Sequence, residues 1–236
     1  SVTWSRVKWS SACCCLPTWV VDTMLGRPAS ALIDGPSGPI EVVVEDPVGP
    51  IKGLAVVAHP HPLMGGTMDN KVVHTLVRAF VQSGWRAVRF NFRGVGQSAG
   101  AWDEGRGEST DLLAVVAHHR AEPDVQALPL ALAGFSFGGF IAAQTFARLK
   151  QAQEGQPDRV AADHLVLVSP ATSKYTVPTV PAGTLVVEGE QDDVVPLSAI
   201  LDWARPQNLP VTVVPGTGHF FHGQLGTLRD IVKRHL

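Results

Sequence analysis

The chain has 236 residues, of which 45% are hydrophobic and 17% charged, and its formal net charge is -2. This length and composition predict one folded domain with its own core and argue against extensive disorder. The near balance of charges gives no electrostatic footprint for nucleic acid or an anionic membrane. The cysteines, Cys13, Cys14 and Cys15, are adjacent, so they predict neither distant disulfides nor a zinc site. No apolar run approaches the ~20 residues that a membrane span needs.

The first 23 residues differ from the rest of the chain. They hold three of the six tryptophans and all the cysteines, and no helical or alternating pattern runs through them. We interpret residues 1–23 as a leader or extension outside the core, with a natural start near Met24, and expect the folded domain to cover residues 24–236. Arg6 and Lys8 precede a short apolar stretch, which leaves secretion as an alternative to the cytoplasmic location that we expect.

Predicted strands and helices alternate along the remaining chain. Strands are predicted at residues 31–34, 40–45, 53–58, 86–92, 128–135, 164–169, 184–188 and 211–214, and helices at 71–82, 108–120, 137–150, 196–204 and 224–235. Asn70 is a candidate N-cap for the first of these helices. The alternation predicts an α/β fold: a mostly parallel eight-stranded sheet with helices on both faces. The Gly-Pro-Ser-Gly turn between the first two strands predicts an antiparallel hairpin at one edge.

A candidate nucleophile, Ser136, lies between a predicted strand and a predicted helix. The sequence Gly134-Phe135-Ser136-Phe137-Gly138 matches G-x-S-x-G, and the strand–turn–helix context is that of a nucleophile elbow. We expect a strained backbone at Ser136, and glycines at positions 134 and 138 because a Cβ there would clash. The following helix N-terminus directs N–H groups toward developing negative charge. The alternative is a glycine-rich turn with an idle serine.

A candidate acid and a candidate base follow in chain order. Asp192 and Asp193 come after the strand at 184–188, where a carboxylate faces the ligand crevice of a parallel sheet. His219 comes after the last strand, on a glycine-rich loop that can reach back toward Ser136. The order Ser, Asp, His is that of the hydrolases that carry this elbow. At this point the residue types leave either aspartate open as the acid.

Three segments, GFSFGG, GEQDDVVP and GTGHFFHG, together resemble the α/β-hydrolase superfamily. The resemblance covers about residues 30–236 and is to its small, lidless, esterase-like branch related to the dienelactone hydrolases. The family pattern Gly-x-x-Asp-x-x-Val-Pro aligns with Gly189, Asp192, Val195 and Pro196. The resemblance therefore implies a catalytic triad of Ser136, Asp192 and His219.

The same resemblance implies an oxyanion hole with two backbone donors. One is the N–H of Phe137, which follows the nucleophile, and the other comes from the loop at residues 59–66. Pro60 and Pro62 have no N–H, so they are excluded. Similarity to the His-Gly-x loops of relatives favours His61, with Leu63 and Met64 as alternatives. The spacing His59-x-His61 also allows a metal site, but no third ligand is obvious nearby, and we predict neither a metal nor another cofactor.

The sequence leaves no room for a lid. Only residues 170–183 separate the strands between which many relatives insert a cap domain. We therefore expect a shallow, open crevice, which suits short acyl esters better than long lipid chains. The apolar side chains expected at its rim are Met64, Trp102, Phe140, Tyr175, Phe220 and Phe221.

These features predict a serine carboxylesterase that cleaves short-chain esters through an acyl-enzyme. A thioesterase, or an amidase or peptidase, would use the same triad. A non-catalytic interaction module on the hydrolase fold is the alternative from another class, and labelling by a fluorophosphonate would separate it from an enzyme. The expected partner is a small ester, with no nucleic acid and no membrane, and the chain is expected to be a monomer or a small homo-oligomer.

Overall fold

The computed structural model describes residues 28–154 and 160–236. The predictions made for residues 1–23 lie outside this part of the chain. The described strands are β1 (Ala31–Ile33), β2 (Ile40–Glu45), β3 (Leu54–Ala58), β4 (Arg86–Phe90), β5 (Leu130–Phe135), β6 (His164–Val168), β7 (Leu185–Gly189) and β8 (Thr212–Val214). The described helices are α2 (Lys71–Gln82), α3 (Arg106–Arg120), α4 (Phe137–Gln153), α5 (Leu197–Ala204) and α6 (Leu225–His235), with short 3-10 turns η1 (Pro62–Met64) and η2 (Arg205–Gln207).

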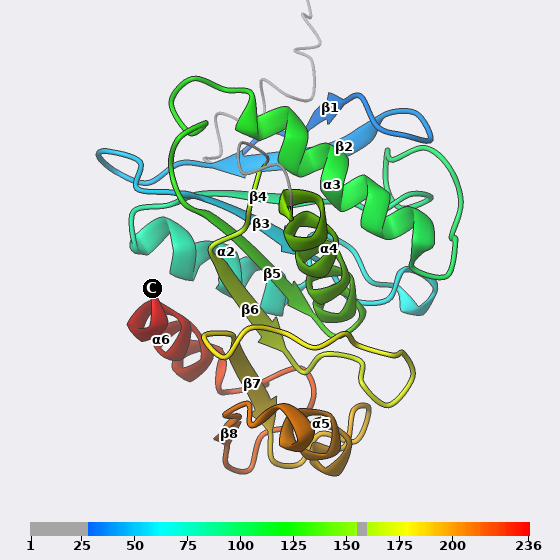
Figure 1. Ribbon diagram of the computed structural model, residues 1–236, viewed down its shortest axis with the longest axis vertical. Coiled ribbons are helices and arrows are strands. Elements are labelled where there is room, and N and C mark those ends of the chain that lie inside the picture. Colours follow the sequence, from blue (N-terminus) through cyan, green and yellow to red (C-terminus); the bar gives the residue numbers. More distant parts are fainter. Residues whose placement is uncertain (1–27, 155–159) are drawn as a thin grey trace, which may run out of the picture.

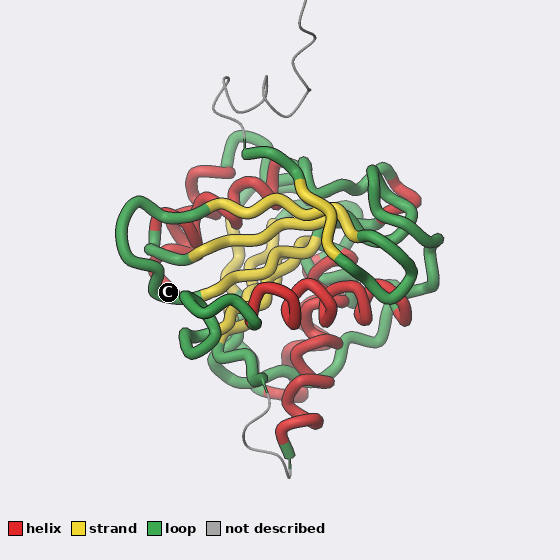
Figure 2. Tube along the Cα trace, turned by 90° about the horizontal axis from the view of Figure 1, so that it is seen from above, coloured by secondary structure: helices red, strands yellow, loops and turns green. Residues whose placement is uncertain are grey.

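The eight strands form one sheet in the order β1-β2-β4-β3-β5-β6-β7-β8. β2 pairs antiparallel with both β1 and β4, and the pairs from β4 to β8 are parallel. Figure 1 shows the sheet running through the molecule with the β1–β2 hairpin at one end, and Figure 2 shows its strands as one twisted layer. The predicted α/β-hydrolase fold, including its antiparallel edge, is confirmed.

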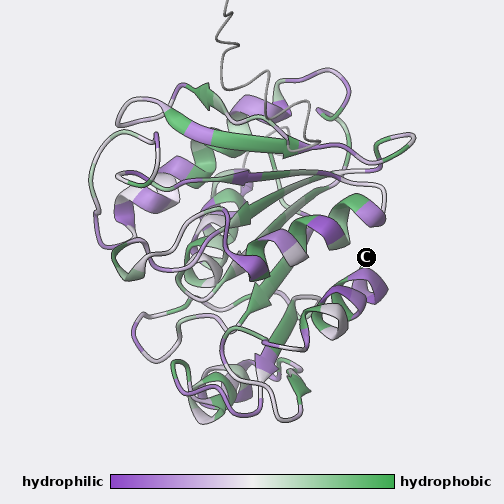
Figure 3. Cartoon of the chain, turned by 180° about the vertical axis from the view of Figure 1, so that it is seen from behind, coloured by the Kyte–Doolittle hydropathy of each residue, from purple (hydrophilic) through white to green (hydrophobic). Residues whose placement is uncertain are grey.

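Two cores lie on opposite faces of the sheet. Along β3, Leu54, Val56 and Ala58 contribute to the core under α3, α4 and α5, whereas Ala55 and Val57 contribute to the core under α2 and α6. This division follows from the two-residue period of a strand, because successive side chains point to opposite faces. A strand covered on both faces is therefore apolar throughout, which is why the central strands are mostly green in Figure 3.

Local hydrogen bonds explain where elements begin and end. α2 starts at Lys71 as expected, because the Asn70 side chain accepts a hydrogen bond from the Val72 N–H at 2.8 Å. β4 ends at Phe90, two residues earlier than the sequence predicts. The Phe92 N–H donates to Nε2 of His59 at 3.0 Å instead of joining the sheet. Most other predicted boundaries differ by three residues or fewer.

The connection between β6 and β7 contains no helix in the described chain, and no cap covers the sheet there. The parallel strands β3, β5, β7 and β8 all end at the same edge of the sheet, so the loops that follow them meet there. These loops carry every predicted catalytic and oxyanion residue. No described helix is both long and apolar enough to span a membrane.

Candidate active site

Ser136 lies in a sharp turn between β5 and α4. Its φ of 56° and ψ of -117° fall in a region that residues with a Cβ rarely occupy. The turn is tight because glycine stands on both sides of it. A Cβ on Gly134 would lie 2.1 Å from the Gly138 oxygen, and a Cβ on Gly138 would lie 2.3 Å from the Ala58 oxygen. The packing of α4 against β5 and β3 therefore requires both glycines, as expected from the sequence.

Asp192 and His219 form a buried pair. His219 Nδ1 lies 2.6 Å from Asp192 Oδ2, and both side chains are nearly inaccessible to solvent. The other carboxylate oxygen of Asp192 accepts hydrogen bonds from the N–H groups of Val194 and Val195, at 2.9 and 2.7 Å. Asp193 makes no such contact with a histidine in the described residues and is exposed. The geometry therefore favours Asp192 over Asp193 as the partner of His219.

The environment of Asp192 keeps it ionised. Burial by itself would raise its pKa, but hydrogen bonds from His219, Glu188 and the Val195 N–H bring the pKa below its ordinary value. The ionised Asp192 accepts a hydrogen bond from Nδ1 of His219. This bond keeps the proton of the neutral imidazole on Nδ1. The opposite nitrogen, Nε2, is then left to accept a proton.

Ser136 and His219 line the same open pocket, which has a volume of about 370 Å³. No hydrogen bond joins Ser136 Oγ to the His219 ring within the described residues, and such catalytic contacts commonly tighten only when substrate binds. The remaining wall is formed mainly by the loops after β3, β6, β7 and β8. Its apolar members include Met64, Val194, Val195 and Phe220.

The loop after β3 presents one suitable backbone donor. The N–H of Leu63 donates to His61 Nδ1 and that of Met64 donates to the His61 carbonyl, so these two groups are already occupied. The N–H groups of His61 and Phe137 have no acceptor among the described residues. Since Pro60 and Pro62 have no N–H, the free backbone donors among the expected candidates are those of His61 and Phe137.

The side chain of His61 holds this loop in place. Because Nδ1 accepts from Leu63, the ring proton sits on Nε2, which lies 3.0 Å from the hydroxyl of Tyr175. The ring also packs against Trp102 and Phe137, with centroids 4.5 and 5.1 Å away. Burial, followed by repulsion from Lys174, lowers the pKa of His61, which favours this neutral form.

Three of the six side chains expected at the rim line the pocket: Met64, Tyr175 and Phe220. The other three do not, and the expectation is corrected for them: Trp102, Phe140 and Phe221. Trp102 and Phe140 pack against residues of the pocket wall, and Phe221 is buried in the core under α2 and α6.

Local packing explains why these three side chains do not line the pocket. Trp102 packs behind the oxyanion loop against His61, and Phe140 is buried in the core, where it stacks on Tyr175 at 4.7 Å. Phe220 is 44% exposed whereas Phe221 is fully buried. The positive φ of Phe221, 52°, turns these neighbouring side chains in different directions. A sequence pattern gives the apolar character of such residues but not the side of a turn to which each one points.

His59 is structural. It is fully buried, and its Nε2 accepts the N–H of Phe92, so that nitrogen carries no proton. Burial lowers the pKa of His59 to about 4, which keeps the ring neutral. The grouping of potential metal ligands found in the described residues lies elsewhere, at His118, His119 and Glu122. Glu122 is held there by Arg86 at 2.6 Å, and no prediction rests on this grouping.

Sequence reasoning missed Glu188, which was treated only as the end of a strand. It is fully buried and lies next to the Asp192–His219 pair. The signal was available, because an acidic residue inside an apolar strand that is covered on both faces is unusual.

A strained serine above a parallel sheet, beside an Asp–His pair, defines the α/β serine hydrolases. The model of the family described as Serine aminopeptidase, S33 matches residues 63–200. The chain is 38% identical to a structure described as an alpha-beta serine hydrolase homologue from Coxiella burnetii, with a TM-score of 0.76, covering 88% of this chain and 97% of that one.

Two further comparisons agree. A serine hydrolase without lid from Xanthomonas campestris is 36% identical, with a TM-score of 0.78, covering 88% of this chain and 93% of that one. An uncharacterised protein of Rickettsia prowazekii is 32% identical over an alignment of 202 residues, and the match covers 80% of this chain and 80% of that protein. The chain therefore belongs to the α/β serine hydrolases and is a hydrolase without a lid.

Proposed function

We propose that the protein is a serine carboxylesterase that hydrolyses short-chain esters. One observation carries this proposal: the strained Ser136 and the buried Asp192–His219 pair open into a single pocket that also contains two unoccupied backbone N–H groups. A nucleophile, a base, a group that orients the base and two oxyanion donors are the parts that acyl transfer requires.

The mechanism follows from these positions. His219 Nε2 takes the proton of Ser136 as its Oγ attacks the ester carbonyl, and Asp192 stabilises the resulting imidazolium. The N–H groups of His61 and Phe137 receive the oxyanion, and removing such a donor costs about 2.7–4 kcal/mol in a comparable site. His219 then returns the proton to the leaving alcohol. A water activated in the same way hydrolyses the acyl-enzyme and restores Ser136.

The pocket supports short acyl groups. About 370 Å³ is near the lower end of ligand-binding cavities. Met64, Val194 and Phe220 are exposed at its mouth even though large apolar side chains normally avoid water. With no lid over this surface, a long acyl chain would leave most of its length in solvent and gain little from burial.

The name of the matched family raises an aminopeptidase as the competing function. An aminopeptidase needs a negative group near the nucleophile to bind the substrate's protonated amino terminus. Among the described residues that line the pocket, Lys174 carries the one permanent charge and none is acidic. A positive group at that mouth repels an amino terminus, so the electrostatics favour neutral or anionic esters.

The test compares hydrolysis of p-nitrophenyl esters from acetate to dodecanoate with that of aminoacyl p-nitroanilides and acyl thioesters. We expect kcat/KM to peak at short acyl esters and to fall for long chains. Ser136→Ala should lower kcat on the order of 10⁶-fold, as for other serine nucleophiles. Ser173→Ala, an exposed serine on the loop after β6, is the matched control and should leave kcat unchanged. Preference for the anilides would favour the peptidase, and wild-type turnover by Ser136→Ala would refute the proposal.

A further inference from the structure

Glu188 is placed where an ionised carboxylate would be costly. It is the fourth residue of β7, a strand in which every residue is buried, and its own exposure is 0%. No described lysine or arginine pairs with it. A buried charge without a cationic partner is strongly unfavourable, and such a group normally becomes neutral.

The two carboxyl oxygens of Glu188 differ in their hydrogen bonds. Oε1 accepts hydrogen bonds from the hydroxyl of Ser169 and from the N–H of Gly189, both at 3.0 Å. Oε2 is buried and receives no donor in the described part of the chain. If Glu188 carries a proton, Oε2 is therefore the oxygen that holds it.

The titratable neighbour of Glu188 is Asp192, and each carboxyl group shifts the pKa of the other. Two neighbouring carboxyl groups can share a hydrogen bond only when one of them is protonated. Asp192 already accepts from His219 Nδ1 and from the N–H groups of Val194 and Val195. Asp192 is thus the ionised partner, and the proton belongs to Glu188. A donor from Glu188 would complete the roughly four acceptor positions of the Asp192 carboxylate.

The titration behaviour agrees with this placement. Burial first, and then the neighbouring Asp192, raise the pKa of Glu188 to about 9. The titratable groups facing Glu188 are Asp192 and, beyond it, His219, and no lysine or arginine of the described residues contacts Glu188 to oppose this shift.

We propose that Glu188 is a positioning residue: a neutral carboxylic acid whose Oε2–H donates to Asp192 and fixes the Asp192–His219 pair under Ser136. Ser169 in turn orients Glu188 by donating to Oε1. The resulting chain of hydrogen bonds runs from the end of β6 through β7 to the loop after β8. The catalytic part of this inference rests on the proposed function, whereas the protonation of Glu188 does not.

Two substitutions separate the donor from the bulk of the side chain. Glu188→Gln keeps an acceptor for Ser169 and a neutral N–H donor for Asp192, and we expect its kcat to stay within about twofold of wild type. Glu188→Met keeps a similar volume but removes the donor. We expect kcat to fall about tenfold with little change in KM, the effect of losing one hydrogen bond to a charged group. Ser169→Ala, which removes one donor to Glu188, should give a smaller loss of the same kind.

The protonation state is measured without substrate. In infrared difference spectra between wild type and Glu188→Gln, a carbonyl stretch of a protonated carboxylic acid should be lost at pH 7, and in the wild type it should weaken as the pH rises through about 9. A carboxylate band at pH 7 would overturn the inference, and so would equal losses of kcat in Glu188→Gln and Glu188→Met. If Glu188→Met fails to fold, the spectrum and Glu188→Gln still decide. A protonated Glu188 in a protein that hydrolyses no ester would reject the proposed function alone.

Discussion

Two cavities lie on either side of the N-terminus of α2, and they differ in how their polar groups are used. Asn70 lines the small pocket that holds Ser136, whereas the next residue, Lys71, lines a larger hollow of about 960 Å³. We refer to this larger hollow as the charged groove. It is lined by Pro28, Ser30, Glu41, Val43, Glu45, Met68, Asp69, Lys71, His74, Thr75, Arg78, Arg89, Leu225, Gly226 and Arg229.

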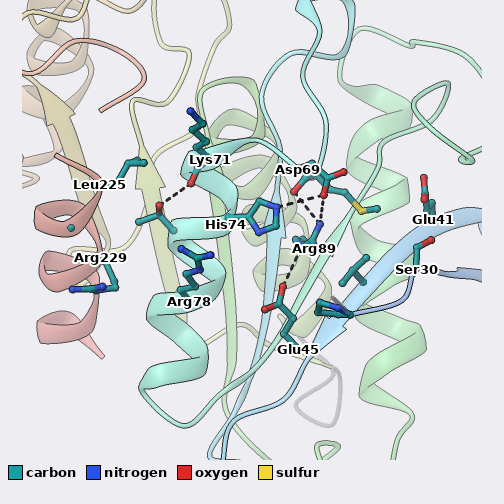
Figure 4. A pocket seen from close by; sticks show the side chains of 15 residues that line it. Ser30, Glu41, Glu45, Asp69, Lys71, His74, Arg78, Arg89, Leu225 and Arg229 are labelled. Atoms are coloured by element: carbon teal, nitrogen blue, oxygen red, sulfur yellow. Dashed lines mark hydrogen bonds and ion pairs between the residues drawn. The ribbon is translucent and has the colours of Figure 1, made fainter. Parts of the chain in front are cut away.

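In the charged groove the buried Arg89 is paired with neighbouring carboxylates. Figure 4 shows Arg89 between Asp69 and Glu45, and the distances from its guanidinium to those carboxylates are 2.6 and 3.2 Å. His74 lies 3.5 Å from the same Asp69. In the small pocket, by contrast, the Ser136 hydroxyl and the N–H groups of His61 and Phe137 have no partner among the described residues. The difference teaches that cavity size does not locate chemistry, whereas positioned groups without partners do.

The first prediction concerns the acid beside the small pocket and has the largest expected effect. Asp192→Asn should lower kcat for a short p-nitrophenyl ester by about 10⁴-fold, because an amide no longer fixes the His219 proton on Nδ1. Asp193→Asn, one residue further along, is the control and should change kcat by less than about twofold, because this exposed side chain contacts no histidine in the described residues. If Asp193→Asn instead carried the loss, the assignment of the acid would be reversed.

A second test concerns His59, which is fully buried at the start of the loop after β3. The pKa of His59 is about 4 in the folded protein, against an ordinary value of 6.5. Between these two pH values the unfolded chain binds a proton at His59 that the folded protein does not. Stability from the neutral ring is therefore full above pH 6.5 and is lost as the pH falls toward 4, by up to about 3 kcal/mol.

The measurement is urea unfolding of wild type and His59→Gln at pH values from 7.5 to 4.5. The difference in unfolding free energy between the two proteins should shrink as the pH falls, and the contribution of Glu188 is common to both and cancels. The exposed His118→Gln serves as control and should run parallel to wild type. A difference that stays constant with pH would contradict the buried neutral ring.

A third test moves to the charged groove. Arg89→Met should destabilise the protein by about 2 kcal/mol, below the usual loss for a buried pair, because Asp69 and part of Glu45 can still be solvated. Its kcat/KM should stay within about twofold of wild type, since no catalytic group changes. Unfolding curves and kinetics on one preparation check both parts. A tenfold loss of kcat/KM in a folded Arg89→Met protein would show that the groove takes part in the reaction.

The smallest effects are expected for the exposed cations of the groove. Lys71→Ala and Arg78→Ala should each change stability by less than about 0.5 kcal/mol and leave ester hydrolysis unaltered, as for ordinary surface substitutions. Thermal melts and initial rates measure this directly. A clear kinetic effect of either substitution would give the charged groove a role that its internal pairing does not suggest.

Much of the fold could be predicted from the sequence because its signals are local. Strand β2 and helix α2 begin and end where the hydrophobic pattern and the Asn70 cap indicate. The nucleophile elbow was recognisable because G-x-S-x-G lies between an apolar strand and a helix, although the contact that requires Gly138 is with Ala58 on another strand. The mostly parallel arrangement of the strands could be predicted from their alternation with helices.

The remaining features depend on the backbone geometry of individual loops or on contacts between distant segments, which a residue pattern does not show. The sequence could not show that Phe220 faces the pocket while Phe221 faces the core, because this depends on one positive φ. It also could not show that the N–H groups of Leu63 and Met64 donate to His61, which leaves the backbone N–H of His61 itself as the free donor. The role of Glu188 depends on Ser169 and Asp192, which reach it from different loops.

The central claim is that Ser136 is an activated nucleophile, and active-site labelling tests it most directly. Wild-type protein is treated with a fluorophosphonate, and the modified peptide is identified by mass spectrometry. We expect one label per chain on Ser136, no label on Ser136→Ala, and much slower labelling of Asp192→Asn. A folded wild-type protein that takes no label, or takes it on another residue, would contradict the account.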